Sequence, residues 1–533
     1  MDMRRLCVTV VCLLAAVPQG HCGTVLATVL PGPLSHLFGM KKVAEEVAAR
    51  GHTVKFLAVE SDVAKLHPTD ISILSYTIQL KKGDMDPSSL KLLGPQTFLK
   101  SIGQVTTLFE NACSSILSND TLMAQLKEHN AELMLGETMS PCTQILAAKL
   151  DVPFVNFWLA GPIEPFATSL WRGSNRRAFT PNPLAYFPQM ETGIQTQHMN
   201  FVERMQNFVK YWHFQAQDFI TVRPLVQGIF RRFGVDPDEP RERQRLVMTM
   251  CIADFAVEWL RPMPPNFKLI GPVLPEPARP LPADLEAFME GAGDNGVLLV
   301  AMGTVATLGL RERQAMAAAF AQLPGRVLWR LSKSEVPNEA AIAELRVGNN
   351  TKVATWLPQN DVLGHPRTRA FLSHCGVNGL YEAAYHGVPI VALPFFADQP
   401  ANADKAVARG FALRLNHADI GTEHFRGTIQ RVLTEPSFAA AAKGLSLKLR
   451  TRPRNPTQEA ADWVEHVLAT GGEAYLRTPD DDLLLLVRLS LDVWAACLGA
   501  AAALIYAAFL LARLLLAKLG AALFGCGPKA KAA

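Results

Sequence analysis

The sequence has little net charge, no long run of one charge sign and no cysteine pattern typical of a metal site. A net charge of +4 over 533 residues argues against a nucleic-acid-binding surface. Nine cysteines are present, but no CxxC pair occurs, and five of the nine lie near the two ends of the chain. A disulfide among the other four is compatible with an oxidising compartment, but we do not expect the fold to depend on one.

What the sequence does have is hydrophobic content, 49% of its residues, and enough length for two domains. Residues 271–282 contain five prolines. This proline density excludes a helix and favours an extended linker. We therefore expect an N-terminal domain over residues 23–270 and a C-terminal domain over residues 283–480.

Both ends of the chain carry apolar segments. Arg4 and Arg5 precede an apolar run, which predicts a signal peptide over residues 1–22; an uncleaved signal anchor is the alternative. Residues 493–511 have no charged side chain and are long enough to cross a bilayer once. Basic residues follow in 512–533, so the positive-inside rule places this tail in the cytosol and the body in the lumen.

The N-terminal domain opens with a strand–helix–strand pattern. Residues 24–30 and 53–59 are apolar strands, residues 31–36 form the turn, and residues 37–50 form an amphipathic helix. This is a βαβ unit of Rossmann type, in which ligands bind at the carboxyl ends of the strands. The polar residue at that corner is His36. A neutral histidine there is suited to accept a proton near pH 7, while helix capping or core packing is the alternative.

The most informative stretch is residues 356–399 of the C-terminal domain. It predicts a strand over 369–373, a glycine-bearing turn over 374–379, a helix over 380–386 and a second strand over 389–395. The first N–H groups of a helix lack partners and lie at its positive pole, so such a turn can hold a diphosphate. Gly376 and Gly379 allow close approach, and His374 can add a ring N–H.

Other polar residues of this stretch complete a site for an activated nucleotide sugar. Trp356 offers a flat face for a base, and Glu382 can accept hydrogen bonds from a ribose diol. Asp398 and Gln399, which follow the second strand, can bind sugar hydroxyls.

This stretch resembles the signature of the UDP-glycosyltransferases, a family that includes the microsomal UDP-glucuronosyltransferases. The resemblance implies an α/β fold of the GT-B type, with two Rossmann-like domains facing across a cleft and a C-terminal transmembrane helix. Two departures are visible. Cys375 stands where the family usually has glycine, and Ala401 stands where it usually has an acidic residue.

The resemblance also implies catalytic and binding residues. His36 matches the family's general base, and Glu137 matches the carboxylate that orients it, a position where the family mostly has Asp; a solvated loop carboxylate is the alternative. For Thr304 the alternative is a simple turn. The implied UDP-sugar-binding residues are Thr304, Trp356, Gln359, His374, Gly376, Asn378, Gly379, Glu382, Asp398 and Gln399. No metal site and no cofactor besides the UDP-sugar co-substrate are implied.

The predicted function is an inverting, metal-independent transfer of a hexosyl group, glucuronosyl or glucosyl, from a UDP-sugar to a hydroxyl of a small lipophilic acceptor. The alternative is a catalytically impaired, membrane-tethered UDP-sugar-binding protein, which Glu137, Cys375 and Ala401 would support. A homo-oligomer is compatible with the sequence.

Some aromatic residues of the N-terminal domain are expected to line the acceptor pocket, although most should be ordinary core. They are Phe157, Trp158, Phe166, Trp171, Phe179, Tyr186, Phe187, Phe201, Phe208, Tyr211, Trp212, Phe214 and Phe219.

The C-terminal sequence also bears on location. Lys529 and Lys531 resemble a dilysine retrieval signal of the endoplasmic reticulum, with a solvated basic tail as the alternative. The sequons at Asn119 and Asn349 are consistent with a luminal body, whereas proline excludes the one at Asn455. We expect a single-pass protein of the endoplasmic reticulum membrane.

Overall fold

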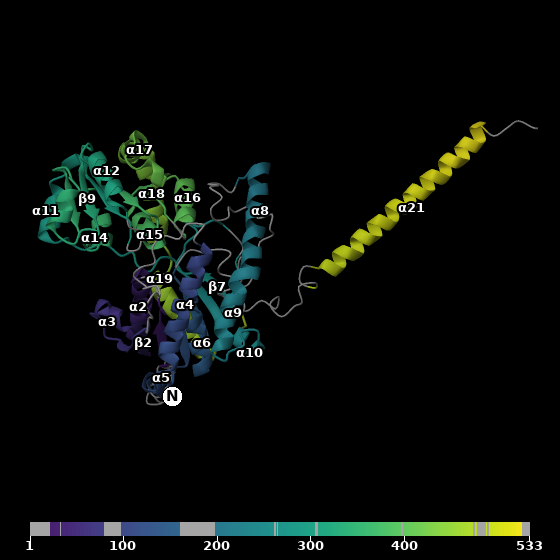
Figure 1. Ribbon diagram of the computed structural model, residues 1–533, viewed down its shortest axis with the longest axis horizontal. Coiled ribbons are helices and arrows are strands. Elements are labelled where there is room, and N and C mark those ends of the chain that lie inside the picture. The colour runs from purple at the N-terminus through teal and green to yellow at the C-terminus, as the bar shows by residue number, and fades with distance from the viewer. Residues whose placement is uncertain are drawn as a thin grey trace, which may run out of the picture. The chain divides into compact units, whose positions relative to one another are not determined.

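The computed structural model describes residues 22–31, 34–78, 98–159, 198–260, 263, 265–303, 308–395, 398–472, 475–476, 487 and 490–524. The chain divides into two compact units, residues 1–477 and 478–533. The first unit contains two parallel sheets, each covered by helices, and these sheets form an N-terminal and a C-terminal lobe (Figure 1).

The N-terminal lobe is built on a seven-stranded sheet with the order β3-β2-β1-β4-β5-β6-β7. All its neighbouring strands pair in parallel. Most of its strands are nearly continuous apolar runs, as expected for a parallel sheet with both faces buried. The strands are β1 (Thr24–Thr28), β2 (Thr53–Val59), β3 (Ser72–Tyr76), β4 (Leu133–Gly136), β5 (Phe154–Trp158), β6 (Leu246–Cys251) and β7 (Phe267–Leu269).

Several helices of this lobe begin at residues that suit a helix start. The Asn119 side chain accepts the Leu122 N–H at the start of α5, and Ser140 accepts the Cys142 N–H at the start of α6. The helices of the lobe are α2 (Leu34–Ala49), α3 (Glu60–Leu66), α4 (Phe98–Leu117), α5 (Asp120–His129), α6 (Pro141–Leu150), α8 (Phe201–Gln217), η2 (Asp218–Val222), α9 (Arg223–Arg232) and α10 (Pro240–Arg245).

The start of α2 differs from the sequence prediction. The helix begins at Leu34, so His36 lies in its first turn and not in the turn before it.

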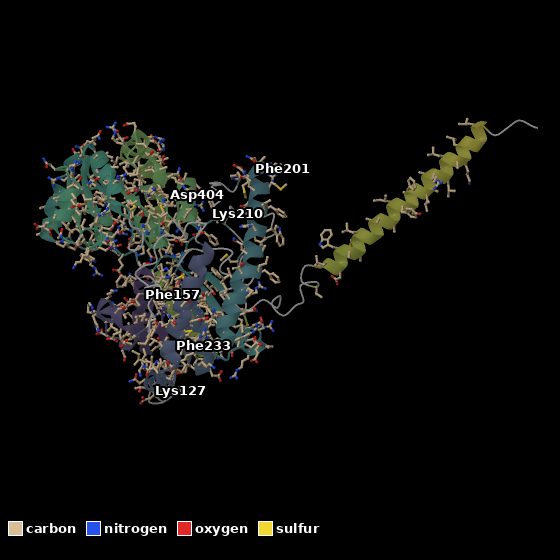
Figure 2. The ribbon with its side chains drawn as sticks, viewed as in Figure 1. Lys127, Phe157, Phe201, Lys210, Phe233 and Asp404 are labelled. Atoms are coloured by element: carbon tan, nitrogen blue, oxygen red, sulfur yellow. A yellow bond between two sulfur atoms is a disulfide. The ribbon has the colours of Figure 1, made fainter. Side chains whose placement is uncertain are left out.

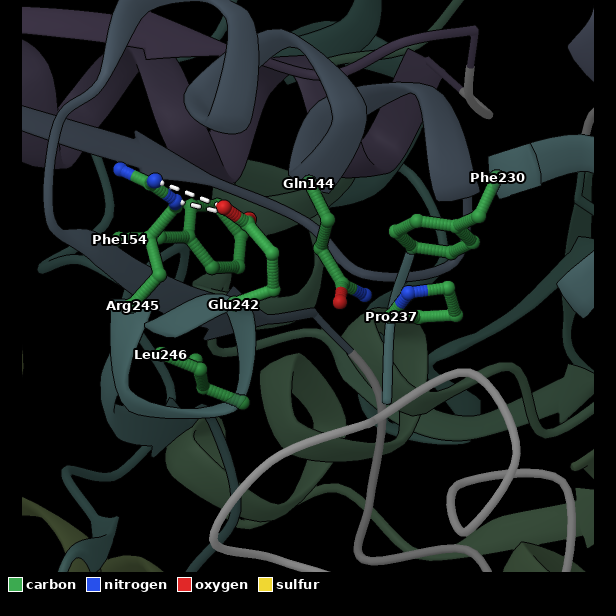
Figure 3. A pocket seen from close by; sticks show the side chains of 7 residues that line it. All are labelled: Gln144, Phe154, Phe230, Pro237, Glu242, Arg245 and Leu246. Carbon is green, nitrogen blue, oxygen red and sulfur yellow. Dashed lines mark hydrogen bonds and ion pairs between the residues drawn. The ribbon is translucent and has the colours of Figure 1, made fainter. Parts of the chain in front are cut away.

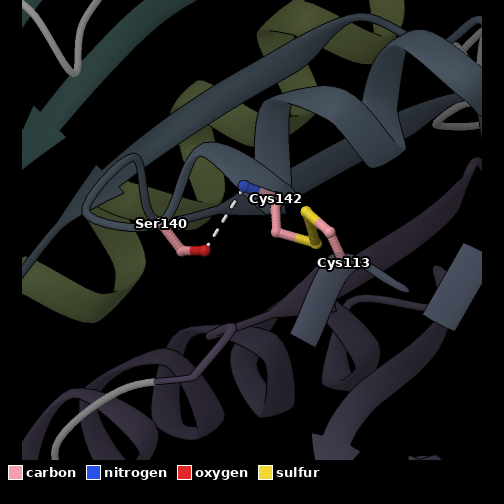
Figure 4. The surroundings of a disulfide bond; sticks show 3 residues. All are labelled: Cys113, Ser140 and Cys142. Carbon is pink, nitrogen blue, oxygen red and sulfur yellow. Dashed lines mark hydrogen bonds between the residues drawn. A yellow bond between two sulfur atoms is a disulfide. The ribbon is translucent and has the colours of Figure 1, made fainter. Parts of the chain in front are cut away.

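A disulfide joins Cys113 on α4 to Cys142 on α6, with their Cα atoms 5.2 Å apart (Figure 4). Closing a loop of 29 residues stabilises a fold by roughly 3–4 kcal/mol in the chain-entropy account. The bond therefore ties α4 to the helix that follows Glu137, and it is a contribution to stability that the sequence pattern did not predict.

The C-terminal lobe has a six-stranded sheet with the order β10-β9-β8-β11-β12-β13, again with every neighbouring pair parallel. The strands are β8 (Val297–Ala301), β9 (Arg326–Arg330), β10 (Thr351–Ala354), β11 (Thr368–Ser373), β12 (Ile390–Ala392) and β13 (Ala412–Arg414). The helices are α11 (Ala283–Glu290), η3 (Gly293–Asn295), α12 (Leu310–Phe320), α13 (Glu339–Glu344), α14 (Gln359–Gly364), α15 (Val377–His386), α16 (Gln399–Ala408), η4 (His417–Asp419), α17 (Glu423–Thr434), α18 (Pro436–Arg450) and α19 (Pro456–Ala469).

The strand–turn–helix–strand arrangement predicted for residues 369–395 is present as β11, α15 and β12. The helix begins three residues earlier than predicted, at Val377. It ends where predicted, because Gly387 adopts the left-handed conformation that terminates a helix.

The last helix of the first unit, α19, crosses back to the N-terminal lobe and contacts α2 (Figure 1). The Arg50 guanidinium donates hydrogen bonds to Asp462 at 2.7 Å and to Glu465 at 2.9 Å. Val464 and Val467 on α19 are buried in the same apolar cluster as Val43 and Val47 on α2. The domains predicted from the sequence place residues 456–469 in the C-terminal domain and do not anticipate that α19 packs on the N-terminal lobe.

The second unit contains α21 (Leu491–Phe524), the one helix among the described residues that is long and apolar enough to cross a membrane. Its candidate span covers Leu491–Gly520. The helix continues past residue 511, so Arg513 and Lys518 lie within it and not in a separate tail.

Candidate active site

His36 and Glu137 meet because of sheet topology. They follow β1 and β4, which are parallel neighbours whose carboxyl ends pair Thr28 with Gly136. The His36 Nδ1 lies 2.8 Å from the Glu137 Oε2. The other carboxylate oxygen accepts the Leu159 N–H at 3.3 Å, and Glu137 is only 2% exposed. Glu137 is thus a buried carboxylate held by hydrogen bonds, which excludes the alternative of a solvated loop residue.

The electrostatic environment of His36 suits a general base. Burial lowers the pKa of His36, but the charge and hydrogen bond of Glu137 raise it more, so the pKa lies above its ordinary value of 6.5. Asp398 of the C-terminal lobe raises it further. His36 therefore lies within electrostatic range of carboxylates from both lobes.

His374 follows β11 and has the properties of a neutral hydrogen-bond donor. Burial lowers the pKa of His374 to about 4, with Arg330 acting in the same direction, so the ring is uncharged at neutral pH. A Cβ atom on Gly303 or Gly376 would lie within 2.6 Å of the His374 Nε2, so both glycines make room for the ring. The His374 Nδ1 is buried and has no hydrogen-bond partner among the described residues.

Next to His374 lies the start of α15, where the sequence predicts an anion site. Gly376 precedes the helix, and no side chain caps its first turn, which contains Asn378 and Gly379. Uncapped N–H groups at the start of a ten-residue helix can bind a diphosphate. Thr304, the other residue expected near the phosphates, lies outside the described residues; its neighbour Gly303 has φ +73°.

Cys375 occupies a backbone conformation that favours glycine. Its φ is +61°, and its side chain is fully buried. The Cys375 N–H donates to the Ser373 Oγ at 3.1 Å, which stabilises the turn. A residue with a side chain in the left-handed region costs roughly 1–2 kcal/mol. The chain therefore carries cysteine at this position at a conformational cost.

Trp356, Gln359 and Glu382 lie on or next to α14 and α15. Trp356 is 71% exposed, which leaves its ring accessible to a ligand. The Gln359 Nε2 donates to the Glu382 Oε2 at 2.5 Å. Burial raises the pKa of Glu382 to about 7, whereas the bond from Gln359 acts against this rise. The structure thus joins Gln359 to Glu382, two of the residues expected to bind the UDP-sugar.

Asp398 and Gln399 stand at the start of α16. The Gln399 Oε1 accepts the Phe395 N–H at 2.9 Å, so its amide oxygen is used within the loop. Asp398 accepts a hydrogen bond from the Asn402 Nδ2 at 2.7 Å. Burial raises the pKa of Asp398 above its ordinary value, although Asn402, Lys405 and His36 act in the opposite direction.

Sequence reasoning missed two residues that touch the site. Arg330, at the end of β9, donates a hydrogen bond to the Gly303 carbonyl and lowers the pKa of His374. Asn402 donates hydrogen bonds to Asp398 and to the Cys375 carbonyl in the loop after β11. The position of Arg330 at the carboxyl end of a strand was a signal that could have found it, whereas nothing in the local pattern pointed to Asn402.

The aromatic residues expected to line an acceptor pocket have different surroundings. Phe157 and Trp158 are core residues of β5, 0% and 5% exposed. Residues 160–197, with five of the expected aromatics, lie outside the described residues. Phe201 on α8 is 68% exposed, and Trp212 on the same helix is 48% exposed; Phe157 and Phe201 are labelled in Figure 2.

A hollow elsewhere in the N-terminal lobe is distinct from this site (Figure 3). Its wall includes Phe154 and Leu246, the first residues of β5 and β6, so it lies at the amino edge of the sheet. Arg245 and Glu242 form an ion pair at 2.9 Å beside it. His36 and Glu137 follow carboxyl ends of strands, at the other edge.

Glu286, Glu290 and His365 bring metal-ligand atoms within 4.8 Å of one another. The His365 Nδ1 accepts the Arg367 N–H at 3.1 Å, so the neutral ring carries its proton on Nε2. That nitrogen faces Glu286 at 3.4 Å, and Arg367 pairs with Glu290 at 3.2 Å. These hydrogen bonds and ion pairs explain why the three side chains lie together. His365 precedes the amino end of β11.

Two Rossmann-like lobes of this arrangement have the GT-B fold. The calicheamicin glycosyltransferase has a similar structure, with a TM-score of 0.58 and 19% identity over 84% of this chain and 99% of that chain. A UDP-glucose: anthocyanidin 3-O-glucosyltransferase in complex with UDP gives a TM-score of 0.56 and 17% identity over 84% of this chain and 99% of that chain.

The sequence comparisons define the family. The family model described as UDP-glucoronosyl and UDP-glucosyl transferase matches residues 23–520, and the chain belongs to this family. It is 31% identical to UDP-glucuronosyltransferase 2B1 of Rattus norvegicus, over 89% of this chain and 90% of the relative. It is 32% identical to UDP-glucuronosyltransferase 2A3 of Cavia porcellus, over 92% and 94% of the two chains. The protein is a UDP-glycosyltransferase enzyme, and its C-terminal apolar helix is consistent with a membrane anchor.

The pair of His36 and Glu137 predicts the pH dependence of transfer. The base must be neutral, so kcat/KM, which reports ionisations of the free enzyme, should rise with pH through a pKa above 6.5. In Glu137→Gln the remaining burial lowers the pKa of His36, so this rise should move to lower pH while kcat falls by about 10²-fold or more. Glu137→Asp keeps the charge and should keep the rise near its original pH. An unchanged pH profile in Glu137→Gln would remove this carboxylate from the mechanism.

The strained loop predicts how substitutions at Cys375 behave. Glycine relieves roughly 1 kcal/mol of backbone strain but removes a buried side chain of similar worth. Cys375→Gly should therefore keep the melting temperature and the calorimetric affinity for UDP. Cys375→Val should have a lower melting temperature and a weaker affinity for UDP, because a β-branched residue rarely adopts positive φ. Loss of UDP binding in the glycine variant would show that the thiol itself contributes.

Proposed function

We propose that the protein transfers a hexosyl group, glucuronosyl or glucosyl, from a UDP-sugar to a hydroxyl of a small lipophilic acceptor, by a single inverting displacement that needs no metal. The observation that carries this proposal is the buried pair of His36 and Glu137, 2.8 Å apart, within electrostatic range of Asp398 in the other lobe. A base from one lobe and a sugar-binding carboxylate from the other are the groups that such a transfer requires.

The His36 tautomer follows from its partner. Nδ1 faces a carboxylate, which only accepts, so Nδ1 carries the proton and Nε2 keeps its lone pair. Nε2 removes the acceptor hydroxyl proton as the acceptor oxygen bonds to the anomeric carbon and UDP leaves. The imidazolium formed in this step is stabilised by Glu137. One displacement from the face opposite the leaving group inverts the anomeric configuration.

The departing diphosphate gains negative charge, which the start of α15 can stabilise. Unpaired N–H groups at a helix N-terminus stabilise an anion without rearrangement. The neutral, buried ring of His374 lies beside this helix start. These protein groups support a mechanism in which the leaving group is stabilised by hydrogen bonds.

Lipophilic acceptors and a location in the endoplasmic reticulum membrane belong to the same proposal. The apolar helix α21 supports anchoring by a single span, with a luminal body and a cytosolic basic tail. An anchored enzyme lies close to substrates that partition into the bilayer. The curated relatives are named UDP-glucuronosyltransferases, which favours glucuronate as the donor sugar.

One observation favours the alternative of an impaired UDP-sugar-binding protein. Cys375 adopts a φ of +61° in the loop that would hold the diphosphate. One experiment decides between transfer and binding without transfer. Membranes containing the full chain are incubated with UDP-glucuronate, UDP-glucose or UDP-N-acetylglucosamine and with a panel of phenols and sterols. We expect mass spectrometry to detect a glycoside with one donor in the wild type and about 10²–10⁴-fold less in His36→Ala. UDP-sugar binding without any product would establish the alternative.

A luminal body predicts N-glycosylation at two exposed sites. Asn119 and Asn349 are exposed, and the Asn119 Oδ1 caps α5 while its amide nitrogen is left available. Glycosidase treatment should increase the gel mobility of the protein expressed in microsomes. Each of Asn119→Gln and Asn349→Gln should remove one glycan, whereas Asn455→Gln should change nothing because proline follows that residue. Absence of both glycans would contradict the proposed topology.

A further inference from the structure

A buried ion pair links the two lobes. Lys405 on α16 donates to Glu258 at 2.8 Å, and Glu258 lies in the N-terminal lobe after β6. The two side chains are only 5% and 1% exposed. Arg409, one turn further along α16, donates to the backbone carbonyls of Val257 and Glu258. The C-terminal half of α16 is therefore attached to the other lobe through polar contacts.

Lys405 also begins a chain of hydrogen bonds that leads to the donor site. Its Nζ donates to the Asn402 Oδ1 at 3.4 Å. The Asn402 Nδ2 donates to the Asp398 Oδ2 at 2.7 Å and to the Cys375 carbonyl at 3.1 Å. One amide thus contacts both the sugar-binding carboxylate and the phosphate loop.

The donors and acceptors along this series of hydrogen bonds can be arranged in only one way. An ammonium group donates and never accepts, so the oxygen of Asn402 must face Lys405. Asp398 and the Cys375 carbonyl accept hydrogen bonds, so they require the NH₂ group of the same amide. A flipped amide would place its oxygen against two acceptors and its NH₂ group against a donor.

We propose that Lys405 is a positioning residue for donor binding: it fixes the Asn402 amide and thereby the Asp398 carboxylate, and it is itself held by Glu258 of the opposite lobe. The proposal rests on the proposed function, because it takes Asp398 as a ligand of the donor sugar. It makes the geometry of the sugar site depend on contact between the lobes.

The groups that face Asp398 come from several elements. His36 on α2 and Lys405 on α16 stabilise its charge, and Asn402 donates to it. Cys375, after β11, is a buried thiol on which Asp398 acts electrostatically. Asp404 on α16 is paired with Arg414 at 2.5 Å. Removal of Lys405 takes away one of the two cationic groups that lower the pKa of Asp398, so we expect this pKa to rise.

A merely structural role for Lys405 predicts something different. Within the described residues, the second oxygen of Glu258 has no hydrogen-bond partner, so Lys405 is its principal compensation. Lys405→Met alone leaves a buried carboxylate unpaired and is expected to destabilise the fold. The double variant Glu258→Met/Lys405→Met replaces the pair with apolar side chains of similar size, which is often tolerated. If compensation of Glu258 were the whole role, this double variant would behave like the wild type.

The test uses the full chain in detergent, with calorimetric binding of UDP and of UDP-glucuronate or UDP-glucose between pH 5 and pH 8. We expect the double variant to melt near the wild-type temperature and to bind UDP within about threefold of the wild type. Its affinity for the UDP-sugar should fall about tenfold or more, and the pH below which UDP-sugar affinity is lost should move upward. Wild-type affinity and pH dependence in the double variant would overturn the proposal.

Lys268→Met provides the matched control. Lys268 on β7 is another partly buried lysine, placed over the Trp463 ring at 4.5 Å. This variant should keep the UDP-sugar affinity and its pH dependence; if it shows the same loss, the effect is not specific to Lys405. Binding without transfer in the wild type would refute the proposed transferase activity alone. Failure of the wild type to bind any of these UDP-sugars would refute both.

Discussion

Parallel strands place their carboxyl ends at one edge of a sheet, and this constraint determines where the polar groups of the enzyme lie. His36 and Glu137 are 101 residues apart in sequence, yet they meet because β1 and β4 are neighbours. In the second sheet the same constraint places His374 and Asp398 after the adjacent strands β11 and β12. The chemistry of each lobe is a consequence of strand order combined with a few polar residues at strand ends.

Several polar contacts cross the junction between the lobes. Besides the pair of Glu258 and Lys405, the Tyr381 hydroxyl accepts the Asp254 N–H at 2.7 Å, and Arg452 forms an ion pair with Asp254. Such contacts are directional and costly to leave unpaired, so they specify one arrangement more strongly than an apolar surface would. The segment that carries these bonds, residues 254–258, follows β6 of the N-terminal sheet.

Much of the fold followed from the sequence, because buried parallel strands and glycine-bearing turns have strong local patterns. The β11–α15–β12 unit and the Rossmann-type start at β1 were predicted within a few residues. The role of Glu137 came from the family resemblance, and its burial and its bond to His36 required the structure. The disulfide of Cys113 with Cys142 and the return of α19 to α2 are long-range contacts. No local period encodes contacts of this kind, so they could not be read from the sequence.

The length of α21 has a consequence for how the chain meets a bilayer. Its 34 residues extend about 51 Å, whereas the hydrocarbon core is about 30 Å thick. Arg513 stands 22 residues from the start of the helix, about 33 Å along its axis, close to where the acyl chains give way to headgroups. About the last three turns, which include Lys518, then extend beyond the hydrocarbon. There the lysine ammonium can reach the lipid phosphates while the leucines beside it remain in contact with the interface.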